Sequence, residues 1–164
     1  MSKHESLPNA KVGQIIRLVE TLDVLGGISD MEGLAIALEI KRSSLHNPLN
    51  AAELIGIVIT NENVKLTEKG LEFLGSEKKS RKDIFYKLLI EIEPFTTLHR
   101  ALEKKKNIEK ATAINLVKSK VEAARSWKES TTEEMWGVIV NWAEYADLFK
   151  LDRKTNTLHI SRDL

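Results

Sequence analysis

The chain has 164 residues, 42% hydrophobic and 30% charged, with a formal net charge of +1. This composition is typical of a soluble globular protein of one or two domains and excludes an intrinsically disordered chain. No apolar run approaches the roughly 18 residues of a membrane span, the stretch MSKHESLPN lacks the apolar core of a signal peptide, and cysteine is absent. We therefore expect a cytoplasmic protein without disulfides or thiolate chemistry.

The helices of the first half follow from apolar spacing. Residues 10–25 carry apolar side chains every three or four positions, and Gly26 and Gly27 would end this helix in the left-handed conformation. Ser29 and Glu32 have the spacing of a capping box, which would open a second helix ending near Leu38.

A third helix and a hairpin complete this half. The helix follows the polar turn at residues 41–44 and ends before Gly56, and it either begins late, with Asn47 as its cap, or bends near Pro48. Residues 57–60 and 64–67 then form two strands joined by a polar turn. This order is that of a winged helix, a helix-turn-helix variant whose hairpin is the wing.

The near-neutral net charge hides two halves of opposite sign. Residues 1–76 hold 7 Lys and Arg against 10 Asp and Glu, whereas residues 77–164 hold 18 against 14. Because duplex DNA is bound largely through its phosphates, an acidic half that carries a predicted wing disfavours DNA binding there. We place a domain boundary in the charged stretch 76–82, which gives units of 1–76 and 77–164.

The second half repeats the pattern of the first. Apolar spacing predicts helices that end near Pro94, begin at Phe95, and lie within 108–127, and a further capping box at 130–133 opens a helix that leads to a second hairpin over 148–160. The stretches NWAEYADLFKLDRKTNTLHI here and NAAELIGIVITNENVKLT in the first half share one order of features, namely Asn, Ala-Glu, an apolar helix end, a strand, a polar turn and a second strand. We therefore predict a mainly α protein with two short β-hairpins, built as tandem winged-helix units.

The order of the segments LPNAKVGQIIRLVETL, GGISDMEGLAIAL, LNAAELIGIV, VKLTEKG and VNWAEYADLFKLD resembles the AAA-associated C-terminal domain family over residues 7–160. The most specific part is WAEYADLF, residues 142–149, which is similar to the family's Trp-Gly-Arg-Tyr-Ala-Glu-Leu-Phe signature with Ala143 and Glu144 in place of Gly-Arg. Leu66, Thr67 and Gly70 match its Leu-Thr-x-x-Gly motif.

That family is known mainly as a segment appended to ATP-binding subunits of nitrate-, sulfonate- or taurine-type ABC transporters, and as free-standing chains in archaea. The resemblance implies a winged-helix-like fold and an ABC transporter ATPase as partner, and it carries no catalytic residue. The sequence also lacks motifs for catalysis. Gly70 and Gly75 have the spacing of a P-loop, but the lysine that a P-loop needs is missing, and the histidines do not have metal-site spacing with carboxylates. We expect no enzyme activity, cofactor or metal.

Two sets of residues are candidates for binding. The candidates for a protein interface are Trp136, which lies off the apolar stripe of its predicted helix, and the basic cluster of Lys104, Lys105 and Lys106. Trp136 could equally belong to a second buried face of that helix. In the alternative, a DNA-binding transcription regulator, the contacts would come from the third helix and the wings, namely Lys41, Arg42, Ser43, Ser44, His46, Asn47, Asn50, Lys65, Arg153 and Lys154.

The sequence thus favours a non-enzymatic binding or regulatory module whose partner is an ABC transporter ATPase. DNA is the less favoured partner, since Glu62 occupies the tip of the first predicted wing. Exposed apolar helix faces would also allow a homodimer.

Overall fold

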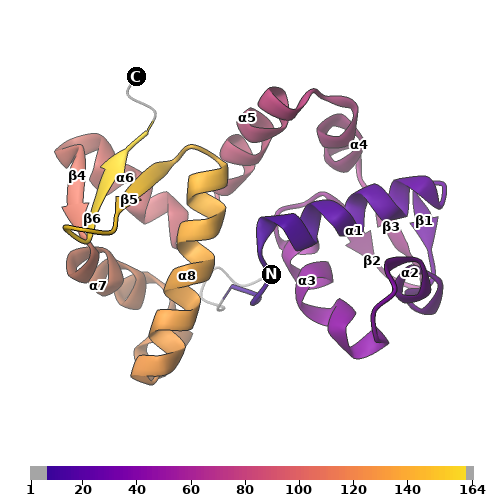
Figure 1. The fold of residues 1–164 in the computed structure, drawn as a ribbon, viewed down its shortest axis with the longest axis horizontal. Coiled ribbons are helices and arrows are strands. Elements are labelled where there is room, and N and C mark those ends of the chain that lie inside the picture. The colour runs from indigo at the N-terminus through magenta and orange to yellow at the C-terminus, as the bar shows by residue number, and fades with distance from the viewer. Residues whose placement is uncertain (1–6, 162–164) are drawn as a thin grey trace. The chain divides into compact units, whose positions relative to one another are not determined.

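The chain is mainly helical with two small antiparallel sheets, as the sequence predicts (Figure 1). The structure, a computed structural model, describes residues 7–161. Two compact units divide between Arg81 and Lys82. The first unit is Pro8–Arg81, and the second contains residues 82–161 together with Leu7. The division lies inside helix α5 (Lys78–Leu89), at a stretch for which the charge pattern predicts a connector.

The first unit is a helical layer with a three-stranded sheet. Its elements are α1 (Val12–Val24), β1 (Ile28–Ser29), α2 (Met31–Leu38), a 3₁₀ turn η1 (Arg42–Leu45), α3 (His46–Leu54), β2 (Val58–Thr60), β3 (Val64–Leu66) and α4 (Glu68–Gly75). The strands lie in the order β1-β3-β2, and both pairings are antiparallel. The sequence predicts the hairpin β2–β3 but not the two-residue strand β1.

The predicted end of α1 and the predicted start of α2 can be compared with the structure. Gly26 and Gly27 have φ values of 96° and 86°, which confirms the predicted glycine end of α1. The predicted capping box at Ser29 and Glu32 is wrong by one residue. The cap is Asp30, whose carboxylate accepts a hydrogen bond from the Gly33 N–H at 2.6 Å, because Ser29 is already paired in β1.

Helix α3 begins at His46, so the late start with Asn47 as its cap, one of the two alternatives at Pro48, is wrong. The 3₁₀ turn η1 precedes it, its first residue is His46, and Leu45 rather than Asn47 occupies the cap position. Pro48 therefore lies in the first turn, where its missing N–H has no helical partner to lose.

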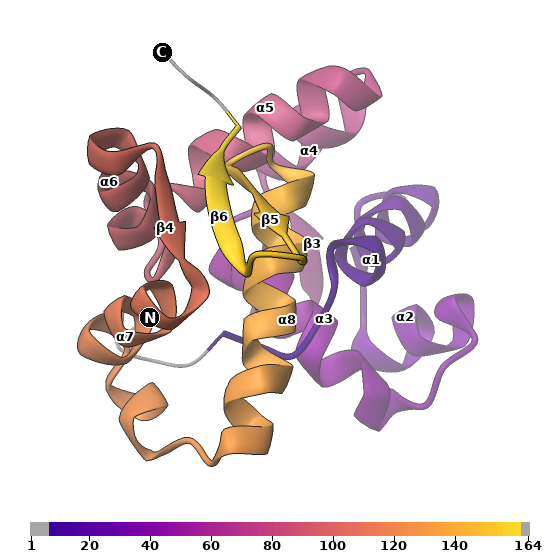
Figure 2. The ribbon, with the colours of Figure 1, turned by 60° about the vertical axis from the view of Figure 1, so that its left-hand side comes forward.

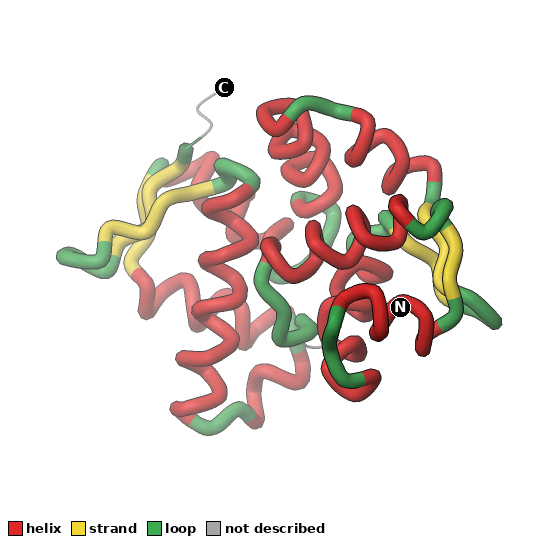
Figure 3. The backbone as a smooth tube through the Cα atoms, turned by 45° about the vertical axis from the view of Figure 1, so that its right-hand side comes forward, coloured by secondary structure: helices red, strands yellow, loops and turns green. Residues whose placement is uncertain are grey.

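The second unit has the same order of elements. After α5 it continues with α6 (Phe95–Lys105), β4 (Asn107–Glu109), α7 (Lys110–Lys120), a 3₁₀ turn η2 (Glu122–Ser126), α8 (Glu129–Tyr145), β5 (Phe149–Asp152) and β6 (Thr157–Ile160) (Figure 2). Its strand order, β4-β6-β5, matches β1-β3-β2 of the first unit, so the predicted repeat is present in the topology. Figure 3 shows the strands of both units in yellow.

The repeat extends to single hydrogen bonds. A carboxylate oxygen of Glu53 accepts from the Thr60 N–H at 2.9 Å, and one of Glu144 accepts from the Leu151 N–H at 3.1 Å, seven residues later in both cases. The helix ahead of each hairpin ends with a left-handed residue, Gly56 with φ 85° or Asp147 with φ 56°. Glu144, where the resemblance expects arginine, is therefore a structural anchor of the second hairpin.

Aromatic packing fills the core of the second unit. Trp142 and Phe149, the first and last residues of the WAEYADLF stretch, are fully buried. The Trp142 ring stacks on Phe95 with 5.9 Å between centroids, and Phe85 meets it edge-on at 6.2 Å. This cluster joins α5, α6 and α8.

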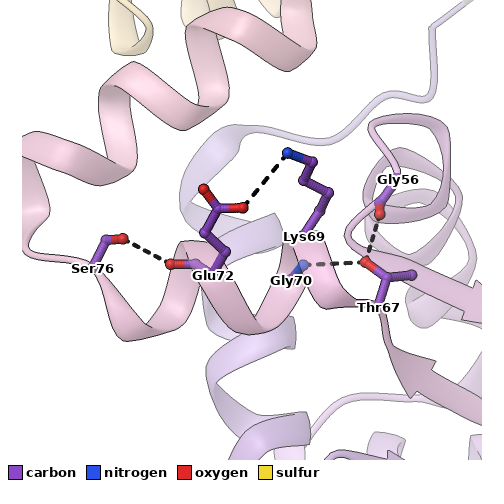
Figure 4. A network of polar contacts seen from close by, with 6 residues as sticks. All are labelled: Gly56, Thr67, Lys69, Gly70, Glu72 and Ser76. Atoms are coloured by element: carbon purple, nitrogen blue, oxygen red, sulfur yellow. Dashed lines mark hydrogen bonds and ion pairs between the residues drawn. The ribbon is translucent and has the colours of Figure 1, made fainter.

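The Leu-Thr-x-x-Gly motif ties α4 to the first hairpin (Figure 4). Thr67 caps α4 by accepting from the Gly70 N–H at 3.1 Å, and its hydroxyl donates to the Gly56 carbonyl at 2.6 Å. The Thr67 N–H donates to the Ile57 carbonyl at 3.1 Å. A Cβ on Gly70 would run into that same Ile57 carbonyl oxygen, so the helix can approach the strand this closely only with glycine.

Candidate functional site

A groove of about 320 Å³ lies in the second unit where α6, β4 and α7 meet. Its lining combines apolar and cationic side chains, which are Arg100, Ala101, Lys104, Lys105, Ile108, Thr112 and Leu116. The strand β4, which sequence reasoning missed, places Ile108 in this lining. Two residues of the predicted basic cluster, Lys104 and Lys105, thus line a groove.

The cations lie on the exposed side of α6. Arg100, Lys104 and Lys105 are all exposed, and the two lysines occupy the last turn, where the helix dipole favours positive charge. Lys106 ends the helix in the left-handed conformation, with its N–H donating to the Leu102 carbonyl, and is not part of the groove lining.

No carboxylate belongs to this lining, so its charged side chains are all cationic. The neighbouring Glu103 is engaged elsewhere, since its carboxylate lies 3.1 Å from His99 Nδ1. Three cations beside Ala101, Ile108 and Leu116 suit a ligand that is both acidic and apolar.

Trp136 is buried, with 5% of its surface exposed. Its neighbours around a small apolar cavity are Ile114, Val117, Trp127, Thr132 and Ile139. Of the two alternatives for this residue, a second buried face is the one that the structure contains, so Trp136 is not an exposed anchor. The pattern failed because a helix packed on two sides has no single apolar stripe.

A hydrogen-bonded chain of three side chains was not foreseen. The Tyr86 hydroxyl lies 2.8 Å from His99 Nε2, and His99 Nδ1 in turn contacts Glu103. The only sequence signal was the four-residue spacing of His99 and Glu103 on one helix face. The chain joins α5 to α6 and holds the histidine in one orientation. Within residues 7–161 there is no group of three His, Asp or Glu side chains placed to hold a metal.

The candidate DNA contacts of the first unit fall into two places. Lys41, Arg42, Ser43, Ser44, His46 and Asn47 are exposed along η1 and the start of α3, with half-buried Asn50 one turn further. His46 and Asn50 contact each other, with 3.1 Å between His46 Nε2 and Asn50 Nδ2. Lys65 lies in the middle of the sheet rather than at the hairpin tip.

The second unit places cations and carboxylates close together at its hairpin and at the start of α8. Arg153 and Lys154 are both exposed at the hairpin turn, and Arg153 lies 3.4 Å from the Glu144 carboxylate. In topology α8 corresponds to α3, and its first two turns expose Glu129, Glu133 and Glu134. A helix with this face would repel DNA phosphates.

Asp152 shapes that turn. Its carboxylate accepts hydrogen bonds from the Lys154 N–H at 2.9 Å and the Thr155 N–H at 3.4 Å. These two bonds, the Lys154 bond first, hold the pKa of Asp152 below its usual value.

We expect the pH dependence of the turn to follow from this lowered pKa. A carboxyl whose pKa is lower in the folded than in the unfolded chain stabilises the fold above its unfolded pKa, and the contribution is lost as the pH falls through the folded value. An NMR titration of the Asp152 side-chain carboxyl should give a midpoint below the ordinary 3.8. In Thr155→Pro, which removes one donor, the midpoint should rise; an unshifted wild-type midpoint would contradict the assignment.

The two helix-and-hairpin units define a mainly helical protein with two small antiparallel sheets. Residues 32–152 match the family model of the C-terminal AAA-associated domain, and the chain belongs to this family. Membership indicates association with AAA or ABC ATPases. The chain has no significant match among curated proteins or among solved structures. Across the described residues, no helix is both long and apolar enough to cross a membrane.

Proposed function

We propose that this protein is a non-enzymatic regulatory module that binds an ABC transporter ATPase, at the cytoplasmic side of the membrane, through the groove of α6, β4 and α7. The observation that carries the proposal is the lining of that groove, in which Arg100, Lys104 and Lys105 stand beside apolar side chains and no carboxylate is present. Family membership supports an ATPase as the partner.

The bound element would be an acidic amphipathic helix of the ATPase. Its apolar side chains, spaced three and four residues apart, would contact Ile108 and Leu116, while its carboxylates would pair with the cations of α6. Exposed charges govern association rate and orientation more than affinity, so binding should weaken as salt rises.

We also propose that each unit is a winged helix used as a scaffold for protein binding. The order of elements and the β1-β3-β2 and β4-β6-β5 pairings support this. Glu62 at the first turn and the acidic start of α8 count against the alternative, a DNA-binding regulator.

Site-specific photo-crosslinking tests the proposal. With p-benzoylphenylalanine in place of the exposed groove residue Thr112, the full chain in its native cell should form an adduct that contains an ABC ATPase subunit. Lys104→Glu combined with Lys105→Glu should lower the adduct yield by roughly tenfold, because the paired charges become repulsive. The matched control is Lys78→Glu with Lys79→Glu, an adjacent exposed pair on α5 outside the groove.

Two kinds of result, one from crosslinking and one from DNA binding, would overturn it. One is an adduct without an ATPase, or one whose yield is the same in both double variants. The other is steeply salt-dependent binding to duplex DNA that Lys41→Glu with Arg42→Glu abolishes, which would establish the DNA-binding regulator instead.

A further inference from the structure

The first unit exposes apolar side chains that the second does not. Among the described residues, the large apolar side chains that remain exposed all belong to the first unit, and they are Val24, Leu25, Ile28, Ile36, Ile59 and Leu71. Scattered single residues of this kind are normal on a protein surface, but neighbouring ones mark a binding site.

Two of them, Ile28 and Ile59, lie in one row across the sheet, on either side of Lys65. Strand register places Ile28 of β1 opposite Lys65 of β3, and Lys65 opposite Ile59 of β2. Directly opposed residues share a face, with Cβ atoms roughly 5 Å apart. The next row contains Val64, which is fully buried, so the row Ile28–Lys65–Ile59 forms the outer face, with Ile28 41% and Ile59 51% exposed.

The second unit shows that the fold does not require apolar residues at these positions. The corresponding row, set by the same register, is Asn107–His159–Lys150, and all three side chains are exposed and polar. Two sheets of one topology therefore present outer faces of different chemistry, although both faces are open to solvent. Isoleucine suits a strand because it is β-branched, but the polar row of the second sheet shows that this topology does not need it at either flank.

The lysine between the isoleucines defines what this face would bind. Lys65 is exposed and has no ion-pair partner among the described residues. Burying it against a purely apolar surface would cost the desolvation of an unpaired charge. A second copy docked face to face about a twofold axis would bring Lys65 against its own equivalent, which is repulsive.

We propose that the outer face of the first sheet, formed by Ile28, Lys65 and Ile59, is a second docking surface, and that its occupant is a protein segment presenting aliphatic side chains around one carboxylate. The carboxylate pairs with the Lys65 ammonium group, and the aliphatic side chains cover the two isoleucines. The inference is independent of the groove in the second unit and of an ATPase as partner.

A pair of designed peptides tests this surface. One alternates valine and threonine around a central glutamate, and the other has lysine in place of the glutamate. Each is titrated into the ¹⁵N-labelled full chain carrying Lys104→Glu and Lys105→Glu, which removes the basic groove as a competing site. The glutamate peptide should shift the amide signals of Ile28, Ile59 and Lys65, with an affinity roughly tenfold higher than that of the lysine peptide.

Variants give the control. Ile28→Asn with Ile59→Gln should weaken binding of the glutamate peptide roughly tenfold, whereas Ile36→Asn, a change at a still more exposed isoleucine on α2, should leave it unchanged. Equal binding of both peptides, shifts confined to other residues, or no shifts at millimolar peptide would each overturn the proposal. So would a dimer, measured by light scattering, that the double variant dissociates.

Discussion

Gly70→Ala is expected to lower the free energy of unfolding of the first unit by roughly 3 kcal/mol, the upper range for inserting a methyl group into a packed site. The added Cβ would overlap the Ile57 carbonyl oxygen, which is backbone and cannot rotate away. Relief requires α4 to move off the hairpin, and that movement breaks the Thr67 hydroxyl bond to Gly56. The gain in helix propensity from glycine to alanine, about 1 kcal/mol, does not offset this loss.

The same helix supplies the control. Gly75 ends α4 and has no atom within 4 Å of the position a Cβ would take. Gly75→Ala should therefore leave stability unchanged or raise it by about 0.5 kcal/mol. Urea denaturation followed by circular dichroism, together with amide exchange of the β2 and β3 strands, measures both. If Gly70→Ala were as stable as Gly75→Ala, the close approach of α4 to Ile57 would be refuted.

Trp136→Ala is expected to lower the stability of the second unit by about 3–5 kcal/mol, the usual cost of removing a large buried aromatic side chain. The indole packs beside Val117, Trp127 and Ile139, and its loss would enlarge a cavity that is already present there.

Trp136→Phe separates packing from hydrogen bonding at that position. The buried indole Nε1 has no hydrogen-bond partner among the described residues. Phenylalanine keeps most of the apolar contact and removes this unpaired N–H, so the stability should stay within about 1 kcal/mol of the wild type. Urea unfolding midpoints of Trp136→Ala and Trp136→Phe measure the two contributions. A loss as large for phenylalanine as for alanine would show that the N–H is bonded in solution.

Several elements could be predicted because their signals are local. The glycine end of α1 and both hairpins follow from residues close in sequence, since turn chemistry and helix ends depend on neighbouring backbone. The repeat was visible because Asn50 and Glu53 recur as Asn141 and Glu144, and the structure gives the two glutamates the same hydrogen bond.

The strands β1 and β4 could not be predicted in this way. Each has only two or three residues. β1 is a strand only because it pairs with β3, and β4 only because it pairs with β6, and both partners lie far along the chain. The same pairing moved the cap of α2 from Ser29 to Asp30. The groove depends on β4 as well, because the strand brings Ile108 beside the lysines of α6.

By itself the sequence determined the helical class of the protein, its repeated order of helix and hairpin, its family resemblance and the basic cluster at Lys104 and Lys105. Only the tertiary structure decided that Trp136 is buried, that these lysines border a groove, and that Ile28, Lys65 and Ile59 form one row. The physical reason is the distance along the chain between the residues that determine each feature. Turns, caps and periodicity are set by residues within one or two helical turns, whereas burial and shared faces depend on which distant segments pack together.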